Sequence, residues 1–157
     1  MAATEPRGAR GFQRFGAGVV AGLIVLAQPI YADRAADIRA SLSDVATALS
    51  AGDPEAAMAP FDKSFADYAT LSGFFQALTK AFQVASEVDV LEEEDNETET
   101  IVSTDWTLTL TDLGTDATVR RNATVKLRLQ RKDGKWKIVD LAPVEFFSPQ
   151  EKPARKQ

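Results

Sequence analysis

The chain has 157 residues, no cysteine and no histidine, and its formal net charge is -5 at pH 7. Without cysteine it can form no disulfide, zinc–thiolate site or thiol nucleophile, and without histidine it lacks the usual general base near neutral pH. The acidic balance argues against nucleic acid as a partner, because phosphates repel a surface of the same sign.

The first 32 residues have the pattern of a secretory signal peptide. A leader with three arginines precedes an apolar run from Phe15 to Ala27, and Pro29 to Ala32 form a helix-breaking segment that ends in a small residue. Cleavage after Ala32 removes three arginines and one glutamate, which takes the net charge from -5 to -7. An uncleaved membrane anchor is the alternative, although the apolar run is shorter than the ~20 residues that span a bilayer. We expect an exported protein, periplasmic or secreted, without stable membrane insertion after cleavage.

Three helices are predicted next. From Asp33 to Ala51 the apolar residues recur every three or four positions and form one stripe; they are Ile38, Leu42, Val45 and Leu49. Gly52 ends this helix, and Asp53 caps a short second helix that Pro60 closes. A third helix, starting near Thr70, has a wide apolar face that suits packing on a sheet.

Alternating residues predict strands in the second half. Val84 to Leu91 alternates, and the acidic run from Glu92 to Glu99 follows. That run lacks the spaced aspartates and the glycine of a calcium loop, so we interpret it as a solvated hairpin tip and predict no metal site. Two long strands, Thr98 to Thr111 and Ala117 to Gln130, each have one apolar phase, which indicates a sheet with one buried face.

The turns predict how these strands pair. A turn centred on Gly114-Thr115 pairs residues whose numbers sum to 229, which sets Trp106 opposite Ala123. Asp133-Gly134 is a hairpin signal because both residues tolerate positive φ. It leads into a closing strand that ends at Leu141, in an antiparallel meander.

The direction of Asp140 is left open by the sequence. Strict alternation from Trp136 and Ile138 places Asp140 on the inward face. A bulge at Ile138-Val139 would instead bury Val139 and turn Asp140 to solvent.

The order of elements resembles the nuclear transport factor 2-like superfamily, which includes SnoaL-like cyclases and ketosteroid isomerases. The Gly52-Asp53 break and the closing strand from Asp133 to Leu141 carry the resemblance, which covers Arg34 to Phe147. It implies an α+β fold: a cone-shaped, curved antiparallel sheet with three N-terminal helices on its concave face. We therefore expect a signal peptide (1–32), one domain (33–147) and a disordered tail (148–157).

The family implies a pocket between sheet and helices, in which enzymatic members use an Asp or His base with Tyr or Asp donors. The histidine-aspartate pattern cannot be carried over, because this chain has no histidine. Six residues are candidates to line the pocket: Arg121, Tyr68, Trp106, Thr104, Asp140 and Phe146. A pocket carboxylate acting with Tyr68 would support an isomerase or hydratase mechanism.

The sequence shows no activated nucleophile, no pair of acid and base side chains and no cluster of metal ligands. No residue is therefore assigned a catalytic role, and no cofactor is predicted. We therefore favour a binding module for a small, partly apolar ligand or a cell-envelope protein, with an isomerase or hydratase as the alternative. The outer face of the sheet is threonine-rich and charged, which argues against an extensive apolar dimer interface there. We therefore expect a monomer or weak dimer.

Arg121 is an anomaly because it lies on the apolar phase of its strand. Three interpretations are open. Its guanidinium can reach water at the rim, form a structural ion pair, or bind an anionic group of the ligand. Asp140 is a poor ion-pair partner, because the predicted register puts it ~20 Å away along the strand.

Overall fold

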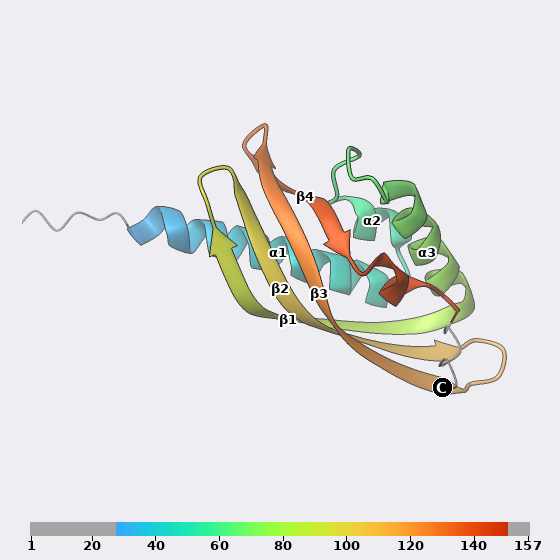
Figure 1. Ribbon diagram of the computed structural model, residues 1–157. Helices are drawn as coiled ribbons and strands as arrows, with labels where there is room; N and C mark the ends of the chain where they lie inside the picture. The colour runs from blue at the N-terminus through green and yellow to red at the C-terminus, as the bar shows by residue number, and fades with distance from the viewer. Residues whose placement is uncertain (1–27, 151–157) are drawn as a thin grey trace, which may run out of the picture.

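The computed structural model describes residues 28–150 (Figure 1). Residues 1–27, with the basic leader and apolar run, and residues 151–157 lie outside the described residues. The elements are α1 (Gln28–Ser50), α2 (Pro54–Met58), α3 (Tyr68–Ala81), β1 (Phe82–Asp95), β2 (Glu99–Asp112), β3 (Thr118–Lys132), β4 (Lys135–Ala142) and the 3₁₀ helix η1 (Val144–Phe147). The predicted α+β class is confirmed.

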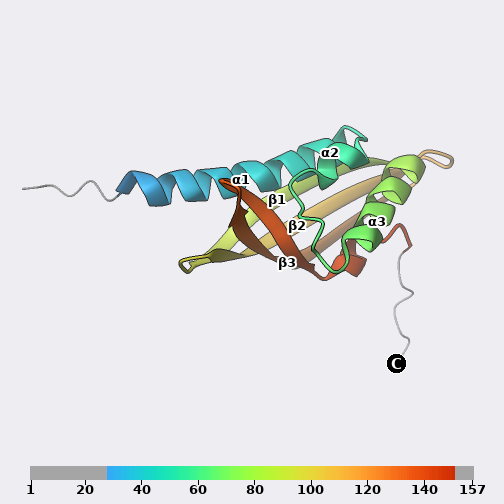
Figure 2. The same cartoon turned by 90° about the horizontal axis from the view of Figure 1, so that it is seen from above.

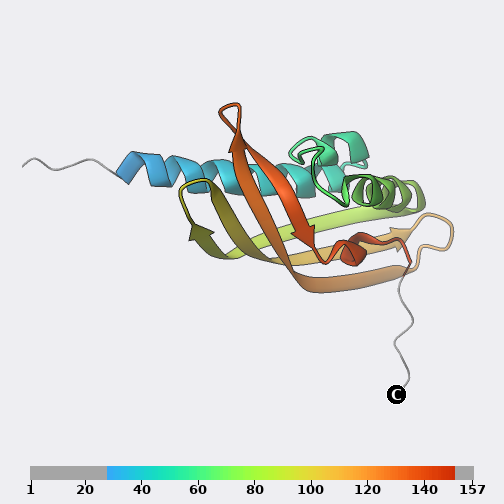
Figure 3. The ribbon, with the colours of Figure 1, turned by 45° about the horizontal axis from the view of Figure 1, so that its top comes forward.

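The four strands form one antiparallel sheet in the order β1-β2-β3-β4. The sheet is strongly curved, and the helices lie on its concave side (Figures 2 and 3). Helix α1 runs along β1: the Ser50 hydroxyl accepts a hydrogen bond from the Ser86 amide at 2.9 Å, and Arg39 pairs with Glu93 at 3.3 Å. The helix therefore covers the edge strand, whose open backbone groups would otherwise be free to pair with another chain.

The predicted register of the central hairpin is confirmed. Leu110 pairs with Val119 and Trp106 with Ala123, and the same pairing continues without a shift along β2 and β3. The stripe predicted on α1 is also buried, since Ile38, Leu42, Val45 and Leu49 have no exposed surface. One apolar face of the sheet and one stripe of α1 thus meet in a single core.

The β3–β4 pairing shifts at Val139, which decides the open question about Asp140. Leu129 pairs with Ile138 as predicted, but Arg128 then pairs with Asp140. Val139 and Leu141 are buried and Asp140 is exposed. The inward placement of Asp140 is therefore wrong, because the bulge lets two apolar side chains reach the core instead of one.

Two predicted boundaries need correction. Strand β1 extends to Asp95, so the first half of the acidic run belongs to the strand and the tip is only the turn after it. A bulge at Leu91 turns that side chain to solvent and brings Glu93 toward Arg39. Helix α1 begins at Gln28 rather than Asp33, because Pro29 falls in the first turn, where the missing N–H costs no hydrogen bond. Within residues 28–150 no helix has the length and apolarity needed to cross a membrane.

Aromatic rings fill the space between the sheet and α3. Phe147 of η1 is fully buried and meets Trp106 edge to face, with ring centroids 5.2 Å apart. It also meets Phe75 of α3 at 5.4 Å, and Phe75 meets Phe61 at 6.2 Å. The segment after β4 thus folds back into the core instead of leaving the domain.

Candidate functional site

The structure does not bring the six predicted pocket residues together. Trp106 and Thr104 are fully buried core residues. The Trp106 indole N–H donates to the Ser86 hydroxyl at 2.8 Å, and the Thr104 hydroxyl donates to the Val125 carbonyl at 2.9 Å. Their inward phase was predicted, but both side chains are enclosed in the core, and η1 packs directly on Trp106.

The other four candidates come from four different elements, α3, β3, β4 and η1. Asp140 is exposed on the outer side of the sheet, and Phe146 is half-buried with its ring 4.9 Å from that of Phe147. Tyr68 begins α3 and lines a separate pocket of about 430 Å³. The pairing of Tyr68 with Asp140 that an isomerase mechanism would use is therefore not assembled.

Arg121 has partners that no sequence interpretation included. Its guanidinium donates to the backbone carbonyls of Ser148 and Pro149, so it holds the first residues of the tail against the inner face of the sheet. Its Nε is buried and has no hydrogen-bond partner among residues 28–150. This geometry makes Arg121 an anchor for the end of the domain.

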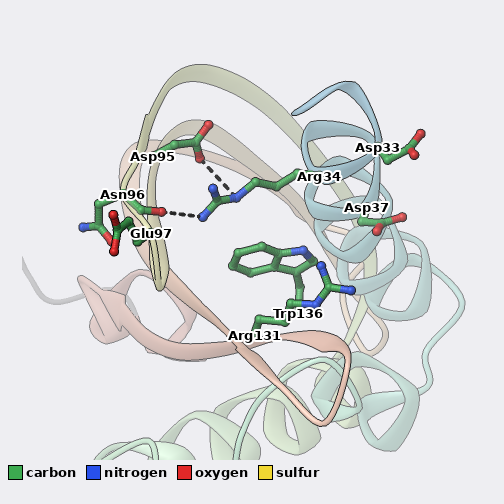
Figure 4. A pocket seen from close by; sticks show the side chains of 8 residues that line it. All are labelled: Asp33, Arg34, Asp37, Asp95, Asn96, Glu97, Arg131 and Trp136. Carbon is green, nitrogen blue, oxygen red and sulfur yellow. Dashed lines mark hydrogen bonds and ion pairs between the residues drawn. The ribbon is translucent and has the colours of Figure 1, made fainter. Parts of the chain in front are cut away.

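A cleft lies at the end of the sheet where two hairpins approach α1. It has a volume of about 720 Å³ and is bordered by α1, the β1–β2 turn and the β3–β4 hairpin (Figure 4). Trp136 of β4 presents its half-buried indole to this space. None of the six predicted candidates lines it.

Arg34 of α1 contacts both of the other elements that border the cleft. Its Nη2 donates to the carbonyls of Asn96 at 3.0 Å and Glu99 at 3.2 Å. Its Nε lies 3.5 Å from the Asp95 carboxylate, and its guanidinium carbon lies 4.5 Å from the centroid of the Trp136 ring. The Arg34 side chain is only 14% exposed. A carboxylate, two carbonyls and an aromatic face surround its charge and hold it in place.

Local sequence explains why these groups meet. The Asn96 side chain accepts the amides of Thr98 and Glu99 at 3.3 and 3.0 Å and so closes the β1–β2 turn. The Thr100 hydroxyl donates to Asp95 at 2.7 Å and orients that carboxylate toward Arg34.

The other hairpin turns through Asp133 (φ 52) and Gly134 (φ 77), which sets Trp136 opposite Arg131. Sequence reasoning placed Trp136 on the inward phase but gave it no role. It gave Arg34 no role either.

The pocket at Tyr68 contains one carboxylate with a perturbed pKa. Hydrogen bonds from the Ser64 hydroxyl and amide and from Lys132 lower the pKa of Asp62 to about 2. The Ser64 amide is 2.9 Å and the Lys132 ammonium 3.2 Å from the carboxylate. Asp62 is therefore a weak base near neutral pH, suited to structure rather than proton abstraction. Within the described part of the chain, no group of three or more acidic side chains is arranged to hold a metal ion.

Comparisons with known proteins agree on the fold. No family model matches the chain, and no curated protein matches its sequence. A conserved protein from Planctomyces limnophilus superposes with a TM-score of 0.66 at 12% identity, covering 72% of this chain and 95% of that one.

Two further solved structures carry informative names. A nuclear transport factor 2-like superfamily protein from Salmonella enterica gives a TM-score of 0.61 at 11% identity, covering 71% of this chain and 89% of that one. A ketosteroid isomerase-like protein from Erwinia carotovora gives 0.57 at 15% identity, covering 68% and 91%. The chain thus has the nuclear transport factor 2-like fold, and the resemblance stated from sequence is confirmed at that level. Identities this low show the fold alone, because one fold can serve unrelated activities.

Proposed function

We propose that this chain is an exported, noncatalytic binding module that holds a small, partly apolar molecule in the cleft beside Trp136. The observation that carries the proposal is the half-buried indole, fixed by Arg34 in a cleft of about 720 Å³. Sites for small molecules commonly measure ~300 to 1,000 Å³ and combine an apolar surface with a few oriented polar groups.

The packing of the interior supports binding at the cleft rather than between sheet and helices. Phe147, Phe75 and Trp106 occupy that interior with their rings in contact. At the cleft, the Asp95 carboxylate is engaged by Thr100 and Arg34. These contacts suit a rigid binding surface, and the isomerase alternative lacks the assembled acid–base pair that it needs.

The ligand test uses protein purified from its native envelope or culture medium. We expect native mass spectrometry to show a retained small molecule, and Trp136→Ala to lose it. Phe74→Ala is the matched control, because Phe74 is also a half-buried aromatic but does not line the cleft. Retention in Trp136→Ala equal to wild type would contradict binding at the cleft. A retained protein in place of a small molecule would favour the cell-envelope partner.

Export is a separate part of the proposal and has its own test. We expect the intact mass of the exported form to correspond to a chain that starts at Asp33. Arg34 would then be its second residue, so the side chain that makes the contacts of the cleft stays in the chain although the first turn of α1 is removed. A full-length species held in the membrane fraction would contradict cleavage and support the anchor.

A further inference from the structure

Both asparagines of the chain stand in a sequence that N-glycosylating enzymes accept. The pattern is Asn, any residue except proline, then Ser or Thr, and it occurs at Asn96-Glu97-Thr98 and at Asn122-Ala123-Thr124. A match of three residues is a weak signal alone, because so short a pattern often arises by chance. The structure places the two asparagines in different surroundings, and this difference favours one of them.

The first of these sequences is the whole connection between β1 and β2. Strand β1 ends at Asp95 and β2 begins at Glu99, so the residues from Asn96 to Thr98 lie outside the strands. All of them are exposed. An exposed turn at the end of a hairpin is a part of a folded chain that another enzyme can reach easily.

The Asn96 side chain uses its oxygen and leaves its nitrogen available. Oδ1 accepts the amides of Thr98 at 3.3 Å and Glu99 at 3.0 Å. Nδ2 donates to no group among residues 28–150, and it points away from Trp136 and outward from the turn (Figure 4). The turn therefore fixes the side chain and presents to solvent the atom that would receive a sugar.

The Thr98 hydroxyl, which the acceptor pattern requires, is available as well. Within residues 28–150 it takes part in no hydrogen bond, because Thr98 contacts the Asn96 side chain only through its backbone amide. Both side-chain groups of the pattern are thus open to a transferase.

Asn122 offers the opposite case. It lies inside β3 and pairs with Thr107 of β2, and its Nδ2 donates to the Thr107 hydroxyl at 2.9 Å. The strand would have to open locally before this segment could enter an active site. The residue two positions earlier also differs, since it is Glu94 for Asn96 and Arg120 for Asn122. A transferase that requires an acidic residue at that position could accept only the first sequence.

We propose that Asn96 is a site of N-linked glycosylation in the exported protein. Nδ2 forms a bond to the anomeric carbon of a sugar, and the bond from that carbon to the pyrophosphate of a polyprenyl-linked oligosaccharide breaks. The lipid pyrophosphate leaves with the bonding electrons, and one proton of Nδ2 passes to a base of the transferase. The inference rests on the export part of the proposed function, because such glycans are added to exported chains.

Peptide mapping by mass spectrometry tests the site on protein purified from its native envelope or culture medium. We expect the peptide that contains Asn96 to carry an added sugar mass and the peptide that contains Asn122 to be unmodified. Trypsin separates the two, because Arg120 and Arg121 lie between them. The intact mass should equal that of the chain from Asp33 plus one glycan.

Three variants make the comparison sharper. Thr98→Ala removes the required hydroxyl and none of the hydrogen bonds of the turn, so the glycan should be lost while circular dichroism shows the same fold. Thr98→Ser keeps a hydroxyl and should keep the glycan. Asn122→Gln is the matched control, because it removes the second sequence and should leave the glycan in place.

The outcomes separate glycosylation from export. An exported chain that starts at Asp33 and carries no sugar at Asn96 would overturn the proposal and leave export supported. A glycan on Asn122 in place of Asn96 would contradict the choice of site, and so would a glycan that persists in Thr98→Ala. A full-length chain without sugar in the membrane fraction would contradict both proposals.

Discussion

Trp106→Ala is expected to lower the free energy of unfolding by about 3 to 5 kcal/mol. The side chain is fully buried at the centre of β2, opposite Ala123, and its ring meets that of Phe147 at 5.2 Å. Truncation removes these contacts and leaves a cavity that a closely packed interior fills only in part. It also leaves the Ser86 hydroxyl without its indole donor. The loss is a large part of the ~5 to 15 kcal/mol that stabilises a typical domain.

Urea unfolding followed by circular dichroism measures this change, and two variants control it. Trp106→Phe keeps an aromatic ring and loses the hydrogen bond to Ser86, so its effect should be much smaller. Trp136→Ala makes the full truncation at a half-buried position and should cost less than Trp106→Ala. A Trp106→Ala midpoint close to that of wild type would show that the inward packing of this strand is not what stabilises the domain.

The parts of the fold predicted from sequence are those that a repeating pattern determines. The β2–β3 register follows from a short turn and one buried face, because a slip of one residue would move every apolar side chain to solvent. The stripe on α1 likewise follows from the helical period. Both patterns are local, and the structure preserves both.

The β3–β4 pairing shows where pattern alone becomes ambiguous. Ile138 and Val139 are consecutive apolar residues, and strict alternation can bury only one of them. The structure buries both by a bulge, which places Asp140 opposite Arg128 on the exposed side. The sequence left both arrangements open, because it could not weigh the gain in buried apolar area against the lost regularity of the ladder.

The candidate site was missed for a different reason. Arg34, Asn96 and Trp136 are far apart in the chain and meet only when α1 crosses the ends of two hairpins. The partners of Arg34 and Arg121 include backbone carbonyls, which every residue has and which leave no mark in the sequence. The inward phase of Thr104 and Trp106 correctly predicted burial, but it could not reveal that η1 would occupy the space beside Trp106.

Because η1 fills the space beside Trp106, a second substitution should also cause a large loss of stability. Phe147→Ala is expected to destabilise the domain by about 3 to 5 kcal/mol, because Phe147 is fully buried and contacts the rings of Phe75, Trp106 and Phe146. Phe146→Ala is the matched control: Phe146 is only half-buried, so truncation there should cost clearly less. Urea unfolding of both variants gives the comparison, and equal effects would mean that η1 does not pack into the core.

The same variant should open a cavity where the resemblance implied a pocket. An apolar cavity of this kind stays dry and can take up a small aromatic molecule. We therefore expect benzene to raise the melting temperature of Phe147→Ala and to leave the wild type unchanged, since a ligand stabilises only the folded state that binds it. If Phe147→Ala does not fold, Phe147→Leu leaves a smaller void and allows the same measurement. A melting temperature that benzene does not change in a folded variant would show that the neighbouring rings collapse into the space that Phe147 leaves, so that no cavity forms.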